Sequence, residues 1–412
     1  MDTHEDFFEF ARSALNKGNS IFALRYYSEA AAGGNVEAMV ELAKIYRTGI
    51  VDIPKNFSEA LKLLNRAAIL GDASAMNLLG VMYESGEGVE ASEEKSFEWC
   101  LKAANAGNAV AMYNVSYKYR TGEGVTKNIV ESGVWLGHAA ENGYPQAMYD
   151  LGRTYDKSRK FKQAFEWFLK AAKKGHSNAM NDVAFMYSNG RGVEKNPEEA
   201  MTWYMLATRL DNVAAIKNLA YHYGYGVNTD KNFDEAVTLY KRAIILGDVE
   251  AINGLGELYY SVKDFGEAVK YFHNAANLGN TDAMVNLYRM YGEGSGVNVN
   301  EKLASHWLQR AVSMGNNLAK ANMGRLLSEA EKDGDELENY MRDKCARRLL
   351  EEAAKAGEEI AMLWLGDFWE KKKDRDSQLK AEFWYYKAAE ANIPGARVKL
   401  EALKNSNSLK DD

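Results

Sequence analysis

Residues 67–89 read AAILGDASAMNLLGVMYESGEGV, and this stretch holds every part of a pattern that returns along the chain. Two alanines are followed by two variable residues and Gly71, and then, after three more residues, by Ala-Met. Met76, Leu79, Gly80 and Tyr83 follow at spacing i, i+3, i+4 and i+7, which places them on one stripe of a helix. The closing Gly-x-Gly-Val supplies backbone angles that end a helix, so the stretch predicts helix, turn and second helix.

The pattern repeats with a regular period. Successive copies are closed by Gly34, Gly71, Gly107, Gly143, Gly175, Asp211, Gly247, Gly279, Gly315 and Gly357. Most intervals are 36 or 37 residues, two are 32 and the last is 42. Such a period is typical of a solenoid built from stacked helix pairs, and it leaves no room for an ordinary globular domain between copies.

Three copies differ in length at one place. The copies that begin at Gly143 and Gly247 lack Gly-x-Gly-Val and are four residues shorter, so we expect a tighter turn between unchanged helices. The 42-residue copy carries a highly charged segment from Glu329 to Glu336 that continues to Arg348. This segment is expected either to lengthen the helices or to form an exposed loop.

The repeats resemble the Sel1-like repeat family, a relative of the tetratricopeptide repeat, from about Phe7 to Ala391. The resemblance implies an all-α, right-handed superhelical α-α solenoid of about eleven helix pairs with a C-terminal capping helix. We predict a single continuous array over residues 1–404. It comprises an N-terminal capping pair (1–33), repeats (34–391) and a capping helix (395–404), followed by a flexible tail (405–412).

Composition narrows the class of protein. The formal net charge of −7 over 412 residues argues against a general nucleic-acid binder, which needs a basic surface. No run approaches 18 uncharged apolar residues, and the acidic start Met1-Asp-Thr-His-Glu5 is unlike a secretory signal. We therefore expect a cytoplasmic protein without a membrane span, with a processed secreted form left open. Cys100 and Cys345 fit core packing in a reducing compartment.

No pattern of catalytic or metal-binding residues emerges. The six histidines form no HExxH, and the sequence has no C-x-x-C, G-x-S-x-G or Walker A motif. Its many Gly-x-Gly sequences lie between two helices, whereas phosphate-binding loops follow a strand. We therefore predict that the protein is not an enzyme and has no catalytic residues, bound metal or cofactor.

The resemblance also implies where a partner binds. In this architecture the first helix of each repeat lines the concave groove, and two of its positions are expected to point into that groove. The first groove position directly follows Ala-Met, and the second groove position directly follows Leu-Gly. The predicted partner-binding residues are Tyr113, Tyr117, Arg120, Tyr149, Arg153, Asn181, Phe185, Lys217, Tyr221 and Arg289. Tyr, Phe and Arg often anchor protein interfaces. The alternative interpretation is that these side chains pack against neighbouring first helices or simply lie on the surface.

These observations favour a non-catalytic scaffold or adaptor. Its expected partner is a protein or peptide segment with acidic and apolar residues, and a monomer is the favoured state. Two alternatives stay open. The protein could be an immunity or inhibitor protein that neutralises a toxin or an enzyme, or a regulator of a cell-envelope or secretion-system assembly.

Overall fold

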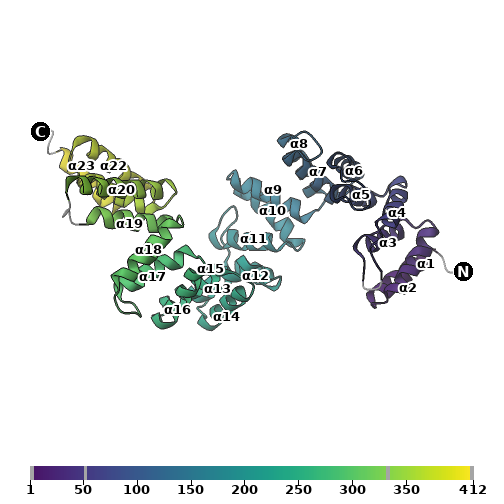
Figure 1. The fold of residues 1–412 in the computed structure, drawn as a ribbon, viewed down its shortest axis with the longest axis horizontal. Helices are drawn as coiled ribbons and strands as arrows, with labels where there is room; N and C mark the ends of the chain where they lie inside the picture. Colours follow the sequence, from purple (N-terminus) through teal and green to yellow (C-terminus); the bar gives the residue numbers. More distant parts are fainter. Residues whose placement is uncertain (1–3, 51–52, 331–334, 409–412) are drawn as a thin grey trace. The chain divides into compact units, whose positions relative to one another are not determined.

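The computed structural model describes residues 4–50, 53–330 and 335–408, and these form 23 α-helices (Figure 1). The helices are α1 His4–Asn16, α2 Ser20–Ala32, α3 Val36–Thr48, α4 Phe57–Ile69, α5 Ala73–Ser85, α6 Glu93–Asn105, α7 Ala109–Thr121, α8 Ile129–Glu141, α9 Pro145–Lys157, α10 Phe161–Lys173, α11 Ser177–Asn189, α12 Pro197–Arg209, α13 Val213–Tyr225, α14 Phe233–Ile245, α15 Val249–Ser261, α16 Phe265–Asn277, α17 Thr281–Glu293, α18 Glu301–Ser313, α19 Asn317–Glu329, α20 Glu336–Lys355, α21 Glu359–Glu370, α22 Arg375–Glu390 and α23 Ala396–Ser408. Eleven helix pairs and one final helix confirm the predicted all-α repeat solenoid.

Each repeat is a pair in which the odd-numbered helix comes first and the next helix packs on it. In most repeats the pair ends at a glycine with a positive φ, as at Gly71 (φ +92°), and the side chain of the next residue caps the following helix. The Asp72 side chain accepts a hydrogen bond from the Ala75 backbone N–H at 2.7 Å, and Asn108 caps α7 in the same way. The short sequence Gly-Asn or Gly-Asp thus ends one helix and starts the next.

The described residues group into two compact units, Met1–Ala215 and Ile216–Asp412, which are treated separately below. In both units the core is built from the alanines of the repeat and from the large apolar residue of the Leu-Gly pair. Leu79 and Leu255 are fully buried, one in each unit. The prediction of one continuous array over residues 1–404 remains a prediction.

The glycine of the Leu-Gly pair makes room for the second helix. A Cβ added to Gly152 would lie 2.6 Å from the Phe168 ring, and one added to Gly256 would lie 2.7 Å from the Phe272 ring. Gly80 faces the buried Cys100 in the same way. Glycine costs helix stability, but here it lets a large side chain of the second helix lie against the first helix.

The second glycine of Gly-x-Gly-Val touches the preceding repeat. A Cβ on Gly124 would lie 2.0 Å from the Glu93 carbonyl oxygen at the start of α6, and one on Gly192 would lie 2.3 Å from the Phe161 carbonyl oxygen at the start of α10. The short copies lack this turn and close with Arg159 and Lys263 at positive φ. Their helices keep 13 residues, which confirms that the deletion is local to the turn.

The long copy extends one helix. α20 has 20 residues where the other second helices have 13 or 16, so the charged segment lengthens this helix, while residues 331–334 lie outside the described part. α23 runs to Ser408, four residues past the predicted end of the capping helix. The rest of the predicted tail, 409–412, is not described. None of the helices in the described ranges is long and apolar enough to cross a membrane.

Candidate functional site

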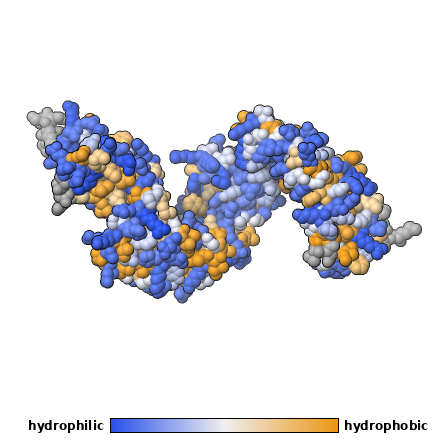
Figure 2. Space-filling model, in the orientation of Figure 1, coloured by the Kyte–Doolittle hydropathy of each residue, from blue (hydrophilic) through white to orange (hydrophobic). Residues whose placement is uncertain are grey.

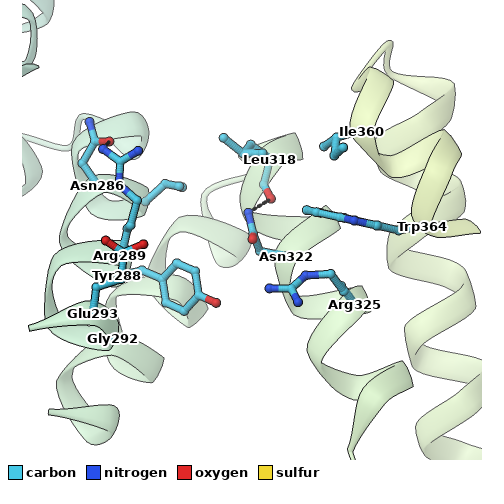
Figure 3. A pocket seen from close by; sticks show the side chains of 11 residues that line it. Asn286, Tyr288, Arg289, Gly292, Glu293, Leu318, Asn322, Arg325, Ile360 and Trp364 are labelled. Carbon is cyan, nitrogen blue, oxygen red and sulfur yellow. Dashed lines mark hydrogen bonds between the residues drawn. The ribbon is translucent and has the colours of Figure 1, made fainter. Parts of the chain in front are cut away.

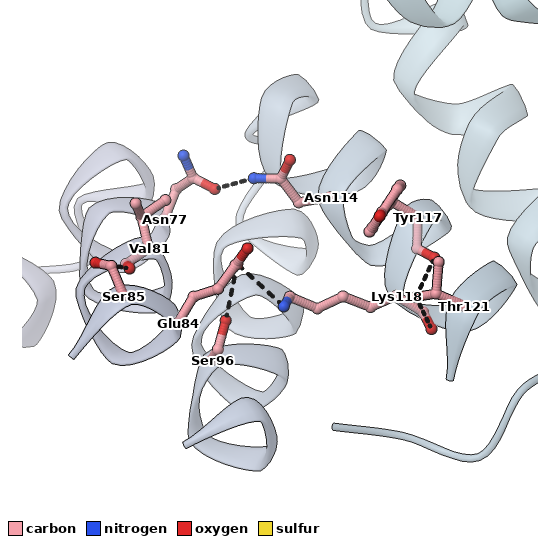
Figure 4. A network of polar contacts seen from close by, with 9 residues as sticks. All are labelled: Asn77, Val81, Glu84, Ser85, Ser96, Asn114, Tyr117, Lys118 and Thr121. Carbon is pink, nitrogen blue, oxygen red and sulfur yellow. Dashed lines mark hydrogen bonds and ion pairs between the residues drawn. The ribbon is translucent and has the colours of Figure 1, made fainter. Parts of the chain in front are cut away.

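The side chains at the first groove position form contacts with the next repeat. The Tyr113 hydroxyl on α7 donates a hydrogen bond to Asp150 on α9 at 2.8 Å. Tyr149 on α9 in turn hydrogen-bonds Asp182 on α11. The amide of Asn114 donates to Asn77 at 3.1 Å one repeat earlier (Figure 4). The residue at the first groove position of one repeat therefore forms a hydrogen bond with a residue of the next repeat. That residue comes directly after the first groove position of the next repeat.

The second unit shows the same arrangement. The Asn286 amide on α17 donates to Asn253 on α15 at 3.1 Å, and Lys217 on α13 pairs with Asp248 at 3.0 Å. None of the residues at the first groove position is exposed. Tyr113, Tyr149 and Lys217 thus contact a neighbouring repeat, which matches the alternative interpretation of these three residues.

The second groove position is different, because most of its side chains are exposed. Tyr117, Phe185 and Tyr221 are 42%, 43% and 49% exposed, and Arg153 is also exposed. The exposed Arg120 lies over the Tyr117 ring at 5.3 Å. Large aromatic side chains left open to solvent are not required for packing, so this position is the better candidate for binding.

Three predicted residues line one pocket in the first unit. Arg153 on α9 and Asn181 and Phe185 on α11 line a cavity of about 380 Å³. Arg191 closes part of it and pairs with Asp156 at 2.9 Å. The sequence placed these residues on one stripe, and the structure brings them together across neighbouring repeats.

Burial shapes the electrostatics beside this pocket. Burial raises the pKa of the Asp182 carboxyl, although hydrogen bonds from Asn181 and Tyr149 lower it. Burial, with the nearby Asp182 charge, raises the pKa of Tyr149 to about 12. Tyr149 also stacks on His176, with ring centroids 4.5 Å apart. Tyr149 and Asp182 are thus half-buried and bonded to each other, while Arg153 and Phe185 remain exposed.

His176 is expected to make the stability of the first unit depend on pH. Its Nδ1 accepts the Ala179 N–H at 3.2 Å as the cap of α11, and its Nε2 lies 3.1 Å from Gln146 Oε1, so the ring must be neutral. Burial lowers the pKa of His176, partly opposed by Asp150. Because the folded pKa is depressed, the stabilisation is complete above the unfolded value near 6.5 and is lost as pH falls towards the folded pKa. We expect the melting temperature to fall from pH 7 to pH 5, and to fall less in His176→Asn.

Asparagine suits this test because it caps the equivalent helices without titrating. The matched control is His306→Asn on α18, where the histidine is exposed. Thermal melts at several pH values compare the three proteins. An equal pH dependence in wild type and His176→Asn would contradict the assignment of His176.

One polar network in the first unit was not predicted. Lys118 on α7 is 2% exposed, and its Nζ lies 3.1 Å from Glu84 Oε2 without the alignment of a hydrogen bond. Ser96 donates to the same carboxylate at 3.4 Å (Figure 4). Burial raises the pKa of the nearby Cys100 to about 11, although the Lys118 charge lowers it. Cys100 therefore stays a protonated core thiol, as the sequence predicts.

The remaining predicted residues lie apart within the second unit. The Tyr221 ring packs against Tyr225 with centroids 4.8 Å apart. Arg289 lies on α17 over the ring of Tyr260 at 4.5 Å and faces a separate pocket. On the surface seen in Figure 2, hydrophobic residues lie in small groups between hydrophilic ones. No group of three or more His, Cys, Asp or Glu side chains in the described ranges is placed to hold a metal ion.

The polar residue after the first groove position carried a signal that sequence reasoning missed. It is Asn or Asp in six copies, at Asn114, Asp150, Asp182, Asn218, Asn286 and Asn322. A polar residue that recurs at one position of a packed repeat needs a partner, and that partner lies in the preceding repeat for at least Asn114, Asp150 and Asn286.

This geometry defines an α-solenoid whose repeats are joined by side-chain hydrogen bonds. The family model of the Sel1 repeat matches ten stretches: 16–35, 36–72, 73–108, 109–144, 145–176, 177–212, 213–248, 249–280, 281–316 and 360–393. The chain belongs to the Sel1 repeat family.

Known proteins agree with this assignment. The chain is similar to the crystal structure of c5321, a protective antigen present in uropathogenic Escherichia coli strains, with 28% identity and a TM-score of 0.63 over 92% of this chain and 81% of that one. A Sel1 repeat protein from Oxalobacter formigenes is 27% identical, with a TM-score of 0.50 over 77% and 93%. Chitin synthase regulatory factor 1 of Schizosaccharomyces pombe is 39% identical over 79 residues, which are 19% of this chain and only 17% of that protein.

Proposed function

We propose that this protein is a non-catalytic scaffold that binds a segment of a partner protein along α7, α9 and α11. The observation that carries the proposal is the exposed row of Tyr117, Arg153 and Phe185, one from each of three successive first helices. Tyr113 and Tyr149 form hydrogen bonds with the next repeat, whereas these three side chains are exposed to solvent. Arg153 and Phe185 of this row also line the 380 Å³ pocket, so a bound segment would find both an open aromatic surface and a recess.

Charge supports a partner segment with acidic and apolar residues. Arg153, Lys157 and Arg191 line the pocket together with Asp156 and Asp182, and burial raises the pKa of Asp182. Aromatic rings beside guanidinium groups suit a segment that pairs a carboxylate with an apolar side chain. The relative from Schizosaccharomyces pombe is named as a regulatory factor of an enzyme, which is in keeping with a non-catalytic role.

The test compares two triple variants as affinity baits. Tyr117→Ala/Arg153→Ala/Phe185→Ala removes the exposed row, and Ile129→Ala/Met205→Ala/Arg209→Ala is the control, since it removes exposed residues of similar chemistry from the second helices α8 and α12. Cross-linked complexes captured from the source organism are quantified by mass spectrometry. We expect partners held by wild type and control to fall at least tenfold on the first variant, with its helicity unchanged.

The result also decides between functions. Partners retained equally by both triple variants would contradict binding along this row. The alternative of an immunity or inhibitor protein predicts a single tightly held partner whose activity is blocked on binding, whereas a scaffold holds several partners without inhibiting them.

A further inference from the structure

The second unit contains a larger pocket between three successive first helices. Its volume is about 510 Å³, and it is lined by residues of α17, α19 and α21. Figure 3 shows Tyr288 and Arg289 entering from α17, Asn322 and Arg325 from α19 in the middle, and Trp364 from α21 on the far side. All three helices lie within the unit Ile216–Asp412.

Two repeats present the same pair of side chains to this pocket. Asn286 and Arg289 on α17 have the same spacing as Asn322 and Arg325 on α19, and the two pairs are 36 residues apart. The next repeat has Trp364 where the others have asparagine. The pocket therefore combines two guanidinium groups and two amides with one indole ring.

The two guanidinium groups keep unused hydrogen-bonding capacity. Arg289 donates to Asn286 Oδ1 at 3.2 Å and lies over the Tyr260 ring, but no carboxylate among the described residues forms an ion pair with it. Arg325 pairs through Nη1 with Glu329 at 2.9 Å, while its Nε is buried without an acceptor. Each guanidinium has five N–H donors, so both can still bind an anionic group.

The apolar part of the pocket lies beside these charges. The Arg325 guanidinium is 5.1 Å from the centre of the Trp364 ring, which holds the two groups next to each other. Leu318 and Ile360 continue the apolar lining near Trp364. Glu293 is the one acidic residue in the lining, and Glu329 pairs with Arg325, so Arg289 is the guanidinium of the pocket without an ion pair among the described residues.

We propose that this pocket binds an extended peptide segment of a partner protein, with Asp or Glu carboxylates held by Arg289 and by Arg325 and an apolar side chain packed on Trp364. The proposal rests on the proposed function as a protein-binding scaffold, but it adds a second site in the other unit with its own residues. A carboxylate satisfies the free donors of an arginine, and the indole beside Arg325 selects for an apolar neighbour. Asn286 and Asn322 can bond the peptide backbone, as side-chain amides do along extended segments.

A random twelve-residue peptide library on phage is the probe. It is selected on the whole wild-type chain after depletion on Arg289→Gln/Arg325→Gln. We expect enriched peptides to share an Asp or Glu beside an aromatic or aliphatic residue. Fluorescence anisotropy with a labelled enriched peptide then measures affinity. Replacing the peptide's acidic residue by its amide, or using the double Gln variant, is expected to weaken binding at least tenfold, and Trp364→Ala at least fivefold.

Two controls keep the test specific. Arg310→Gln removes an arginine that lies over Trp307 at 5.5 Å on α18, outside the pocket, and should bind as wild type does. Arg289→Lys/Arg325→Lys keeps the charge and should weaken binding less than the double Gln variant, which separates recognition from misfolding. The proposal is overturned if no enriched peptide depends on the two arginines, or if Arg310→Gln weakens binding equally.

The α7–α11 triple variant distinguishes this site from the proposed function. Peptides of this second site should bind that variant as strongly as wild type. If partners depend on Tyr117, Arg153 and Phe185 while no peptide depends on Arg289 and Arg325, the scaffold function stands and the second site fails. If both dependences are absent, both proposals fail.

Discussion

Gly124→Ala is expected to lower the free energy of unfolding of the first unit by about 3 kcal/mol or more, since it adds a clash to a backbone cost of roughly 1–2 kcal/mol for a residue at positive φ. Gly124 has φ +69°, and an added Cβ would lie 2.0 Å from the Glu93 carbonyl oxygen and 2.3 Å from its carbonyl carbon. Because both contacts are with backbone at the start of α6, no side-chain rotation relieves them. The turn or the first residues of α6 must move.

Gly122→Ala is the matched control in the same turn. Gly122 also has a positive φ of +93°, but its nearest neighbour to an added Cβ is Lys127 Cβ at 3.5 Å, an ordinary contact. We expect only the backbone cost of about 1–2 kcal/mol there. Urea unfolding gives the overall change, and hydrogen exchange of the α6 amides shows where it acts, since repeat arrays can unfold in parts. Equal losses in the two variants would contradict a clash with the preceding repeat.

Lys118→Ala is expected to cost about 3 kcal/mol, as for other truncations of long buried side chains. Lys118→Met should change stability by less than about 1 kcal/mol or increase it, because replacing a buried ion by a well-packed apolar side chain is often neutral or stabilising. The other repeats support this difference. Their residues at this position include the buried Met82, Met186 and Met290. Methionine therefore fits the space, while the Glu84 carboxylate, 52% exposed, can remain in water.

A double-mutant cycle isolates the Glu84–Lys118 ion pair. Glu84→Gln leaves the buried ammonium without its carboxylate and should cost roughly 1–3 kcal/mol in the wild-type background. In the Lys118→Met background the same substitution should have almost no effect. Chemical unfolding of the four proteins gives the coupling energy. A coupling near zero would show that the two charges do not stabilise the fold.

Most of the fold follows from short-range features of the sequence. The closing glycines, the Asn or Asp caps and the Met-Leu-Gly-Tyr stripe each act within about one helical turn, so they predict where helices start and end. The two shortened turns could be predicted for the same reason, because a deletion between Tyr155 and Phe161 leaves both helical stripes intact. These features do not predict the structure of the long copy. Its charged residues are compatible with helix and with loop, and the structure shows a lengthened α20.

The sequence predicts the helix positions of the candidate site but not which of their side chains are exposed. The sequence predicts both Tyr149 and Phe185 as partner-binding residues, since both lie on the same helical face and neither belongs to the core pattern of the repeat. The structure separates them, because the hydroxyl of Tyr149 has a partner on Asp182 in the next repeat, and Phe185 has no such partner to bury it. Sequence reasoning also missed Lys118, because a lysine within a helix normally indicates a solvated face.

The sequence by itself determined that this chain is a stack of helix pairs of the Sel1 kind, because helix periodicity, caps and turn glycines are local properties of the chain. Only the tertiary structure decided which first-helix side chains are open to a partner. That depends on residues 32 to 37 positions away, such as Asp150 opposite Tyr113, which come close only after neighbouring repeats have packed. The ion pair of the buried Lys118 with Glu84 and the two-arginine pocket beside Trp364 have the same origin, since each joins side chains from separate repeats.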